Sequence, residues 1–248
     1  MSIHRLSPYQ SLAIVVPAYQ EEDALPITLQ EIVDLFLSDL FLQKHPNFQI
    51  EVWVVDDGST DQTSQIAQNF SQRYPQIQCL KLPQNQGMGA ALKMGYLSAQ
   101  SDWITLLPAD GQIPADQLFV LMDQATQDRF DLICTRYLNR KYTPYRWLLS
   151  HGLRWLSTLI LGSSLRSEGP YLIHKTLLSR LPMMSDSFML NLEIPIRAQR
   201  IGARYTEVQI SLRARVAGLS KATSQGRILN TFLDLWALRK KLDQVSIE

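Results

Sequence analysis

Residues 50–61 read IEVWVVDDGSTD, and this stretch indicates the fold class. Ile50–Val55 is an almost entirely apolar run of strand length, which predicts a buried strand. Two aspartates and a glycine follow it, and Ser59 or Asp61 can cap the helix that the apolar spacing predicts over residues 62–73. A buried strand that passes through a short polar loop into a helix is the repeating unit of a parallel α/β sheet.

The same unit recurs along the rest of the chain. Further strands are predicted at residues 12–16, 78–82, 103–107, 131–135 and 205–212, and further helices at 22–42, 89–99, 190–199 and 228–242. This alternation predicts a mostly parallel central sheet flanked by helices. No repeat, low-complexity tract or long linker divides the sequence, so we expect a single domain over residues 1–248.

Bulk composition excludes several classes of protein. The chain has 248 residues, of which 46% are hydrophobic, enough for one sizeable core. A formal charge of +1 does not indicate a nucleic-acid partner. The two cysteines are far apart in apolar surroundings, which predicts buried free thiols. We find no secretory signal and no run of 18 apolar residues, so a cytoplasmic protein without a transmembrane helix is expected.

Acidic residues occur in three loops that follow predicted strands. These loops are PAYQEE at residues 17–22, DDGSTD at 56–61 and PADGQIP at 108–114. Ligands of open α/β sheets bind beyond the carboxyl ends of the strands, so we expect a site there. Asp56 is interpreted as a ligand-binding carboxylate. Asp57, like Ser59 and Asp61, is interpreted as a turn or cap residue.

The glycine-rich stretch 85–89 precedes a predicted helix but matches no phosphate-binding motif. Close packing of this loop explains its glycines at least as well as a phosphate does.

Asp110 and Gln112 lie two residues apart in a turn bounded by prolines. Both side chains can present oxygen atoms toward one point. Mg²⁺ is bound by few protein oxygens and completes its coordination with water and phosphate oxygens. The pair is therefore a sparse but workable platform for a metal–diphosphate complex, in which the metal would neutralise charge on a departing diphosphate.

Four blocks in order resemble the inverting GT-A glycosyltransferases of family 2, most closely the dolichyl-phosphate mannose synthase-like branch. They are VVPAYQEE, EVWVVDDGSTD, the stretch from NQGMG to PADGQIP, and TRY, within residues 12–137. The resemblance continues more weakly through SEGPYLIHK, Glu193 and EVQISLRARVAGLSK. It implies a GT-A, Rossmann-like fold that binds a nucleotide-diphosphate sugar. Residues 12–137 would form the nucleotide-sugar and metal part, and residues 138–248 the acceptor part.

The resemblance also implies roles for individual residues in donor binding. Around the nucleotide base it places Pro17, Tyr19 and Glu21, and at the base and ribose it places Val54 and Asp56. It implies that Ala109, Asp110 and Gln112 form the diphosphate site and bind Mg²⁺ or Mn²⁺.

Basic residues would engage the phosphate charges of donor or acceptor. By resemblance these are Arg136 of TRY, Arg215 and Lys221, and we expect Asp110, Arg136 and Arg215 to act directly in catalysis. Arg213 is interpreted as a surface residue. The implied reaction is transfer of a hexose to a polyprenyl phosphate or another lipid acceptor.

One position departs from the family pattern. Pro108 stands where relatives usually carry the first acid of an Asp-x-Asp motif, which predicts weaker metal binding. A phosphate acceptor is already anionic and requires no base; for an alcohol acceptor, Asp186 and Glu193 are candidate bases.

Two other functions were weighed. A non-catalytic nucleotide-sugar binding protein is the alternative that Pro108 suggests. A nucleotidyltransferase is disfavoured because it predicts a basic, glycine-rich motif after the first strand, where this chain has PAYQEE.

Residues 144–161, PYRWLLSHGLRWLSTLIL, combine arginines, tryptophans and a leucine/isoleucine cluster. This composition is typical of a helix that lies at a membrane surface, although a core helix is equally consistent with it. We therefore hypothesise a peripheral contact with the inner face of a membrane.

Overall fold

The computed structural model describes residues 11–44, 47–125, 129–138, 160–162, 167–214 and 226–244, and the strands within them form one seven-stranded sheet. The strands are β1 Ser11–Ala18, β2 Gln49–Asp56, β3 Ile77–Lys81, β4 Trp103–Leu106, β5 Leu132–Tyr137, β6 Leu172–His174 and β7 Tyr205–Ile210. The helices are α1 Leu25–Phe36, α2 Asp39–Lys44, α3 Thr63–Arg73, α4 Met88–Ser98, α5 Gln117–Ala125, α7 Lys175–Leu178, α8 Leu190–Arg200 and α9 Gly226–Gln244.

The sheet order is β3-β2-β1-β4-β6-β5-β7. Strand β1 pairs in parallel with β2 and β4, and β2 with β3. Strand β6 runs antiparallel to both of its neighbours, while β5 and β7 are parallel to each other. Six strands therefore end at one edge of the sheet, and β6 begins there. The predicted α/β fold with a mostly parallel sheet is confirmed.

Strand β1 shows how the sequence builds two cores, one on each face of the sheet. Leu12, Ile14 and Val16 pack on the face covered by α1, α2, α3 and α5. Ala13 and Val15 point to the opposite face, covered by α4, α7 and α8. All five side chains have no exposed surface, as expected for a parallel strand buried on both faces. Burial of each large aliphatic side chain contributes about 1.5–3 kcal/mol.

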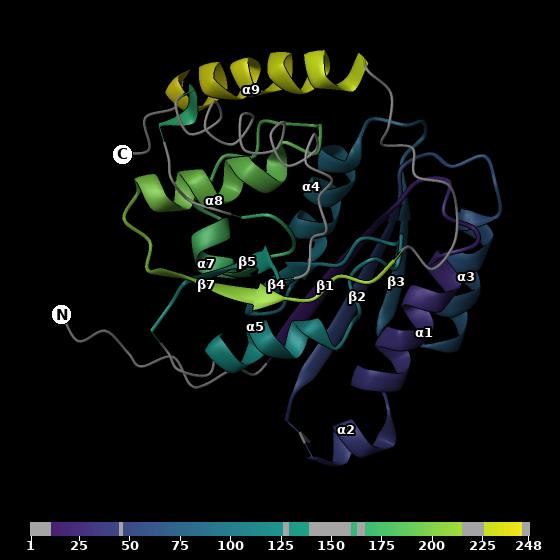
Figure 1. Cartoon of the computed structure of the whole chain (residues 1–248). Coiled ribbons are helices and arrows are strands. Elements are labelled where there is room, and N and C mark those ends of the chain that lie inside the picture. The colour runs from purple at the N-terminus through teal and green to yellow at the C-terminus, as the bar shows by residue number, and fades with distance from the viewer. Residues whose placement is uncertain are drawn as a thin grey trace.

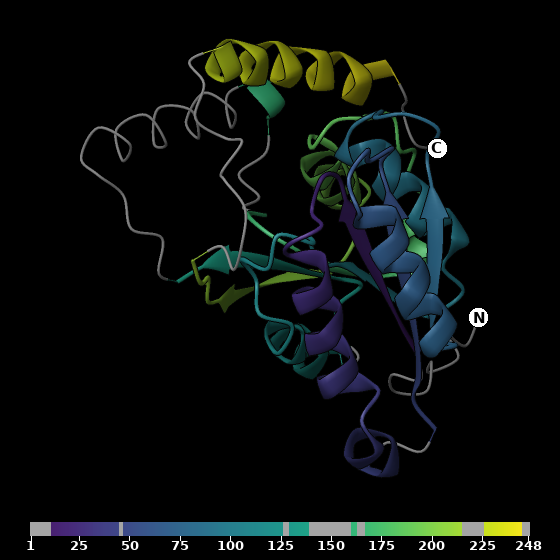
Figure 2. The ribbon, with the colours of Figure 1, turned by 90° about the vertical axis from the view of Figure 1, so that its right-hand side faces the viewer.

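Helix α9 forms an outer layer over α8, as both views of the ribbon show (Figures 1 and 2). Leu235, Leu238 and Leu242 of α9 pack on Met189 and Ile196, which lie at and within α8. Two backbone carbonyls near the end of α9 accept hydrogen bonds from arginines of α8. Arg197 Nη2 donates to Lys241 O at 2.8 Å, and Arg200 Nη1 donates to Leu242 O at 3.1 Å.

Several elements differ from the sequence prediction, and the one-turn helix α7 is among them. The helix predicted at residues 22–42 is divided into α1 and α2, because the Ser38 hydroxyl accepts a hydrogen bond from the Phe41 amide and starts a new helix. Helix α5 follows the Asp110 turn and was not predicted. Strand β6 was not predicted either, since three residues are too short for a periodic signal.

Both cysteines are free thiols, Cys134 buried and Cys79 half-buried, so the prediction holds fully only for Cys134. Burial raises the pKa of the Cys134 thiol to about 12. Within the described residues, no helix is both long enough and apolar enough to span a membrane.

Candidate functional site

A solvent-open pocket of about 280 Å³ lies at the carboxyl ends of β1, β2 and β4. All three acidic loops contribute to it, as does the loop before α4. Its lining comprises Pro17, Ala18, Tyr19, Glu21, Asp57, Asn85, Gly87, Met88, Ala91, Pro108, Ala109 and Asp110. The sequence prediction that these loops meet in one site is therefore correct in its geometry.

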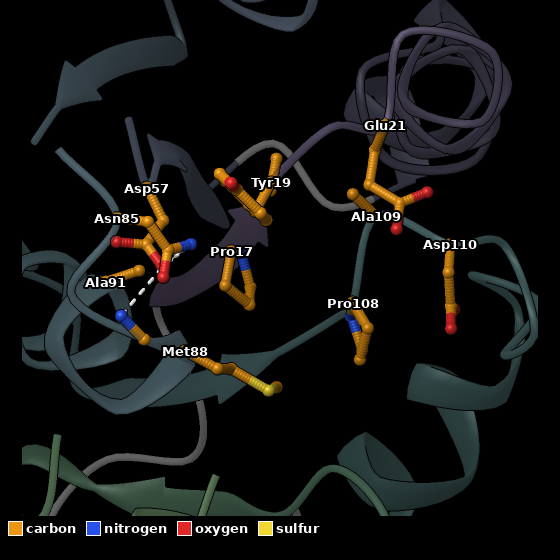
Figure 3. A pocket seen from close by; sticks show the side chains of 12 residues that line it. Pro17, Tyr19, Glu21, Asp57, Asn85, Met88, Ala91, Pro108, Ala109 and Asp110 are labelled. Atoms are coloured by element: carbon orange, nitrogen blue, oxygen red, sulfur yellow. Dashed lines mark hydrogen bonds between the residues drawn. The ribbon is translucent and has the colours of Figure 1, made fainter. Parts of the chain in front are cut away.

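Figure 3 shows how the polar groups divide across the pocket. Asp57 and Asn85 lie on one side, and Glu21 and Asp110 lie on the other. Pro17 and Pro108 lie between them and give the floor a rigid, apolar character. A ligand that spans the pocket would meet carboxylates at both ends and apolar surface in the middle.

Backbone hydrogen bonds hold the first two loops together. The Asp57 amide donates to the carbonyl of Ala18 at 2.8 Å, which extends the pairing of β1 with β2 by one residue. The Gln20 amide donates to the Ser59 hydroxyl at 3.0 Å, and the Glu21 amide donates to Thr63 Oγ1 at 2.9 Å. Tyr19 is thereby fixed at the pocket rim with 38% of its surface exposed.

Asp57 lines the pocket, although the sequence predicted only a turn or cap role for it. Its carboxylate accepts hydrogen bonds from the Asn85 side chain and the Gln86 and Gly87 amides at 2.7–3.0 Å. Desolvation raises the pKa of this carboxyl, and the hydrogen bonds from the Gln86 and Gly87 backbone amides oppose the rise. The predicted turn-forming role is correct, but the turn it forms is a wall of the pocket.

The glycine-rich loop at residues 85–89 is closely packed, which agrees with the packing interpretation of its glycines. The amides of Gln86 and Gly87 are already bonded to Asp57, so they are not available to a phosphate. A Cβ atom on Gly87 would lie 2.7 Å from the carbonyl oxygen of Asp186, so only glycine fits against that backbone.

Val54 and Asp56 do not reach the pocket with their side chains. Both have no exposed surface, and Val54 packs in the core beneath α1. Asp56 accepts a hydrogen bond from the Ser59 amide at 2.8 Å, and Lys81 Nζ lies 3.5 Å from its other oxygen. The expectation that these side chains contact the base and ribose therefore does not match this geometry. Strand alternation explains it, because even-numbered residues of β2 face α1 and odd-numbered ones face α4.

The structure places Asp110 in the pocket and Gln112 behind it. The Gln112 amide donates to Asp110 Oδ1 at 3.1 Å, which closes a tight turn around Gly111. Gln112 itself is not part of the pocket lining. Ala109 is anchored on both sides, since its amide donates to Pro17 O at 3.4 Å and its carbonyl accepts from Thr28 Oγ1 at 3.1 Å.

None of the predicted basic residues that the structure describes lines the pocket, and two of the three lie outside the described residues. Arg136 is at the carboxyl end of β5, two strands from β4, and its guanidinium is 3.9 Å from Glu207. It shares the sheet edge with the pocket but does not line it. Arg215 and Lys221 lie outside the described residues, as does most of the stretch 144–161.

Both candidate bases are engaged. Glu193 is fully buried, accepts hydrogen bonds from the amides of Met184 and Ser185, and pairs with Arg197 at 2.9 Å. Asp186 forms an ion pair with Lys93 at 2.6 Å. Glu193 therefore has a structural role in this geometry, because its carboxylate is fully buried and paired with Arg197.

The oxygen atoms at Asp110 could hold a divalent cation only if a bound substrate and water supplied most of its coordination. Among the described residues, no group of three or more His, Cys, Asp or Glu side chains is arranged to hold a metal. Asp110 and Glu21 lie on the same side of the pocket (Figure 3), while the Asp57 oxygens bind backbone amides. One or two carboxylates with phosphate oxygens and water is the arrangement that Mg²⁺ adopts at nucleotide sites.

Comparison with protein families identifies the chain. The model described as glycosyl transferase family 2 matches residues 13–194. The chain belongs to glycosyl transferase family 2. The family expected from the sequence motifs is thus confirmed.

Curated relatives in this family carry names of lipid-phosphate sugar transferases. A dolichyl-phosphate beta-glucosyltransferase of Trichomonas vaginalis is 36% identical over 155 residues, 60% of this chain and 47% of that protein. The human dolichyl-phosphate beta-glucosyltransferase is 38% identical over 107 residues, 42% of this chain and 32% of its own length. An undecaprenyl-phosphate 4-deoxy-4-formamido-L-arabinose transferase of Pseudomonas savastanoi is 28% identical and covers 92% of this chain and 65% of that protein. The chain thus spans from a third to just under two thirds of these relatives.

Solved structures establish the fold. Glucosyl-3-phosphoglycerate synthase of Mycobacterium tuberculosis, in complex with Mn²⁺, UDP-glucose and phosphoglyceric acid, superposes with a TM-score of 0.69. The two proteins are 19% identical, and the alignment covers 93% of this family 2 chain and 79% of the synthase. The expected GT-A fold is confirmed.

Proposed function

We propose that this protein transfers a hexose from a nucleotide-diphosphate sugar to a polyprenyl phosphate, with assistance from Mg²⁺ or Mn²⁺. The observation that carries the proposal is the pocket itself. In a family 2 chain, the three motif loops and the loop before α4 enclose about 280 Å³ at the carboxyl edge of the sheet. The curated relatives named above act on dolichyl or undecaprenyl phosphate.

The residues of the pocket divide the donor between them. Tyr19 and Pro17 offer flat apolar surface at the rim and floor for a nucleotide base, and Glu21 offers a hydrogen-bond acceptor. Asp110, with Glu21 on the same side, would hold the cation, which neutralises charge on the departing diphosphate. Asp57 contributes by holding the wall of the pocket.

The transfer step requires no proton movement when the acceptor is a phosphate. An acceptor phosphate oxygen attacks C1 of the sugar, the bond from C1 to the diphosphate oxygen breaks, and the nucleoside diphosphate leaves with the electron pair. The configuration at C1 inverts. The burial of Glu193 supports this acceptor class, because Glu193, one of the two candidate bases, does not line the pocket. Arg136, with Arg215 and Lys221 of the part formed by residues 138–248, would neutralise acceptor or donor phosphates.

A thermal-shift panel of UDP-glucose, GDP-mannose and UDP-GlcNAc, each with and without Mn²⁺, tests donor binding. A ligand that binds the folded state raises the melting temperature as its concentration exceeds its dissociation constant. We expect one donor to protect more strongly with Mn²⁺ than without it, and Asp110→Ala to remove only the metal-dependent part. An unchanged Mn²⁺-dependent shift in Asp110→Ala would place the metal elsewhere.

The alternative, a nucleotide-sugar binding protein without catalysis, is favoured by Pro108, which leaves a single acid at the turn. Incubation of the bound donor with dolichyl or undecaprenyl phosphate in detergent separates the two. A glycosylated lipid supports transfer, whereas donor binding without turnover of either acceptor supports the alternative.

Peripheral contact with a membrane forms part of the proposal because the acceptor is a lipid. Flotation with anionic liposomes is expected to recover the wild-type protein and to lose the double variant Trp147→Glu/Leu148→Glu. Equal recovery of both proteins in the soluble fraction would refute attachment through residues 144–161.

A further inference from the structure

The turn that carries Asp110 is held from behind by the segment that follows β7. Ser211 donates its amide to Gln117 Oε1 at 2.8 Å. Two residues later, the Arg213 amide donates to the carbonyl oxygen of Gln112 at 3.0 Å. This segment, residues 211–213, therefore contacts both the turn, at Gln112, and the first residue of α5, Gln117.

The Arg213 side chain adds a third and fourth contact. Its Nε donates to the carbonyl oxygen of Gly111 at 2.6 Å, and its Nη1 forms an ion pair with Glu31 at 2.6 Å. Glu31 lies on α1, and its other carboxylate oxygen accepts from the Ala115 amide at 3.4 Å. The guanidinium is thus fixed between a rigid helix and the turn, in a fork geometry that lysine cannot reproduce.

The contact at Gly111 bears directly on Asp110. The carbonyl of Gly111 and the amide of Gln112 belong to one planar peptide unit and point in opposite directions. Arg213 holds the carbonyl end of this unit, and the amide end donates to Asp110 Oδ1 at 3.1 Å. The orientation of the peptide plane therefore sets the orientation of the carboxylate in the pocket.

We infer that Arg213, braced by Glu31, is a positioning residue for Asp110. It determines how the carboxylate faces the pocket without touching the donor itself. The inference deepens the proposed function and rests on it for the consequence in metal binding. It also assigns a role to a residue that the sequence pattern indicated only as a surface arginine.

The test compares Arg213→Gln and Arg213→Lys with Arg204→Gln as a matched control. Arg204 lies just before β7 and forms an exposed ion pair with Asp131 at 2.8 Å, so its loss removes a guanidinium pair without affecting the turn. Glu31→Gln is the second variant, because it weakens the brace while leaving the arginine in place.

The first measurement is amide hydrogen exchange of the ligand-free protein, resolved to the peptide that contains residues 111–117. We expect exchange of this peptide to accelerate about tenfold in Arg213→Gln, because its anchoring contacts are lost. Arg213→Lys and Glu31→Gln should give smaller increases, and Arg204→Gln none. Unchanged exchange in Arg213→Gln would overturn the inference.

The second measurement is the Mn²⁺ concentration that gives half of the metal-dependent thermal protection by UDP. Loss of a group that orients a metal ligand typically weakens metal binding about 10–100-fold, so we expect an increase of about tenfold in Arg213→Gln. Protection by UDP without metal should change less than about twofold, a split that general loosening of the fold would not give.

Faster exchange with an unchanged Mn²⁺ requirement would overturn the positioning role, since the turn would then be held without consequence for Asp110. Failure of the wild-type protein to gain Mn²⁺-dependent protection from UDP or GDP would refute the proposed function. The exchange measurement needs no ligand and would still confirm or overturn the attachment of the turn.

Discussion

Replacement of Gly58 by alanine tests whether the loop before α4 is packed as tightly as the structure shows. Gly58 has a φ of +72°, and an added Cβ would lie 2.6 Å from the Asn85 amide nitrogen and closer still to the Gln84 carbonyl carbon. These are backbone atoms and cannot rotate away. Gly202 offers a matched control, because its φ is +75° but no atom lies within 4 Å of the added Cβ.

The two substitutions share one energetic cost and differ in another. An L-residue in the left-handed region costs about 1–2 kcal/mol, offset by about 0.4–1 kcal/mol from the restricted unfolded chain. Gly202→Ala should therefore lower the free energy of unfolding by about 0–1.6 kcal/mol. Overpacking against fixed atoms adds about 1–3 kcal/mol, so Gly58→Ala should cost about 2 kcal/mol more than the control.

Differential scanning calorimetry measures this difference. For a chain of this size, 1 kcal/mol corresponds to about 2–4 °C, so Gly58→Ala should melt about 6 °C below Gly202→Ala. Because Asn85 lines the pocket, Gly58→Ala should also weaken UDP binding, whereas Gly202→Ala should not. Equal melting temperatures for the two variants would refute the tight packing of this loop.

Three further predictions concern buried groups. The pKa of the Asp57 carboxyl is raised in the folded state, so the wild-type protein should lose stability relative to Asp57→Asn as the pH rises from about 4 through the folded-state pKa. Urea unfolding across this pH range measures the difference in stability. A relative gain in stability of the wild-type protein would contradict the raised pKa. Arg197→Met should lower the free energy of unfolding by about 3–5 kcal/mol, because it leaves the Glu193 charge unpaired. In urea unfolding, the double variant Arg197→Met/Glu193→Gln should lose less stability than the sum of the losses in the two single variants. Strict additivity of the two losses would mean that the pair is not coupled. The Cys134 thiol should resist a thiol reagent at pH 8 until the protein unfolds, because it is buried and its pKa is raised to about 12. Labelling of the folded protein at the rate of the denatured chain would contradict the burial of this thiol.

The fold was predictable because its signals are local and repeated. Each of the strands β1, β2 and β4 is a buried run that ends in a polar loop, and the sheet edge follows from the rule that parallel strands end together. The break after α1 depends on one hydroxyl, at Ser38, within an otherwise continuous helical pattern. Strand β6 depends on pairing with strands distant in sequence, which no local pattern contains.

The site was predictable as a set of loops but not side chain by side chain. Pro17 and Tyr19 line the pocket because they lie at the carboxyl end of β1 and directly after it, and Asp110 because it lies in the loop that follows β4. Asp57 lines the pocket, whereas the side chain of Asp56 is buried outside it, and the ligand-binding role of Asp56 stays a prediction. Strict alternation from Val54 and Val55 would have shown that Asp57 shares the α4 face. Arg213 could not be placed from sequence, because its partners at Gly111 and Glu31 lie about 100 and 180 residues away.

The reversed direction of β6 has a consequence for how this fold can vary. The chain leaves the sheet at the end of β5, Tyr137, and returns at the start of β6, Leu172, and both points lie on the edge that holds the pocket. The two strands are direct neighbours in the sheet, so their pairing does not depend on the length of the chain between Tyr137 and Leu172. Loop closure grows only slowly with length, by about 0.6 kcal/mol per doubling. The fold can therefore accept segments of very different length between these two strands, at the edge of the sheet that holds the pocket, while the order of the strands stays the same.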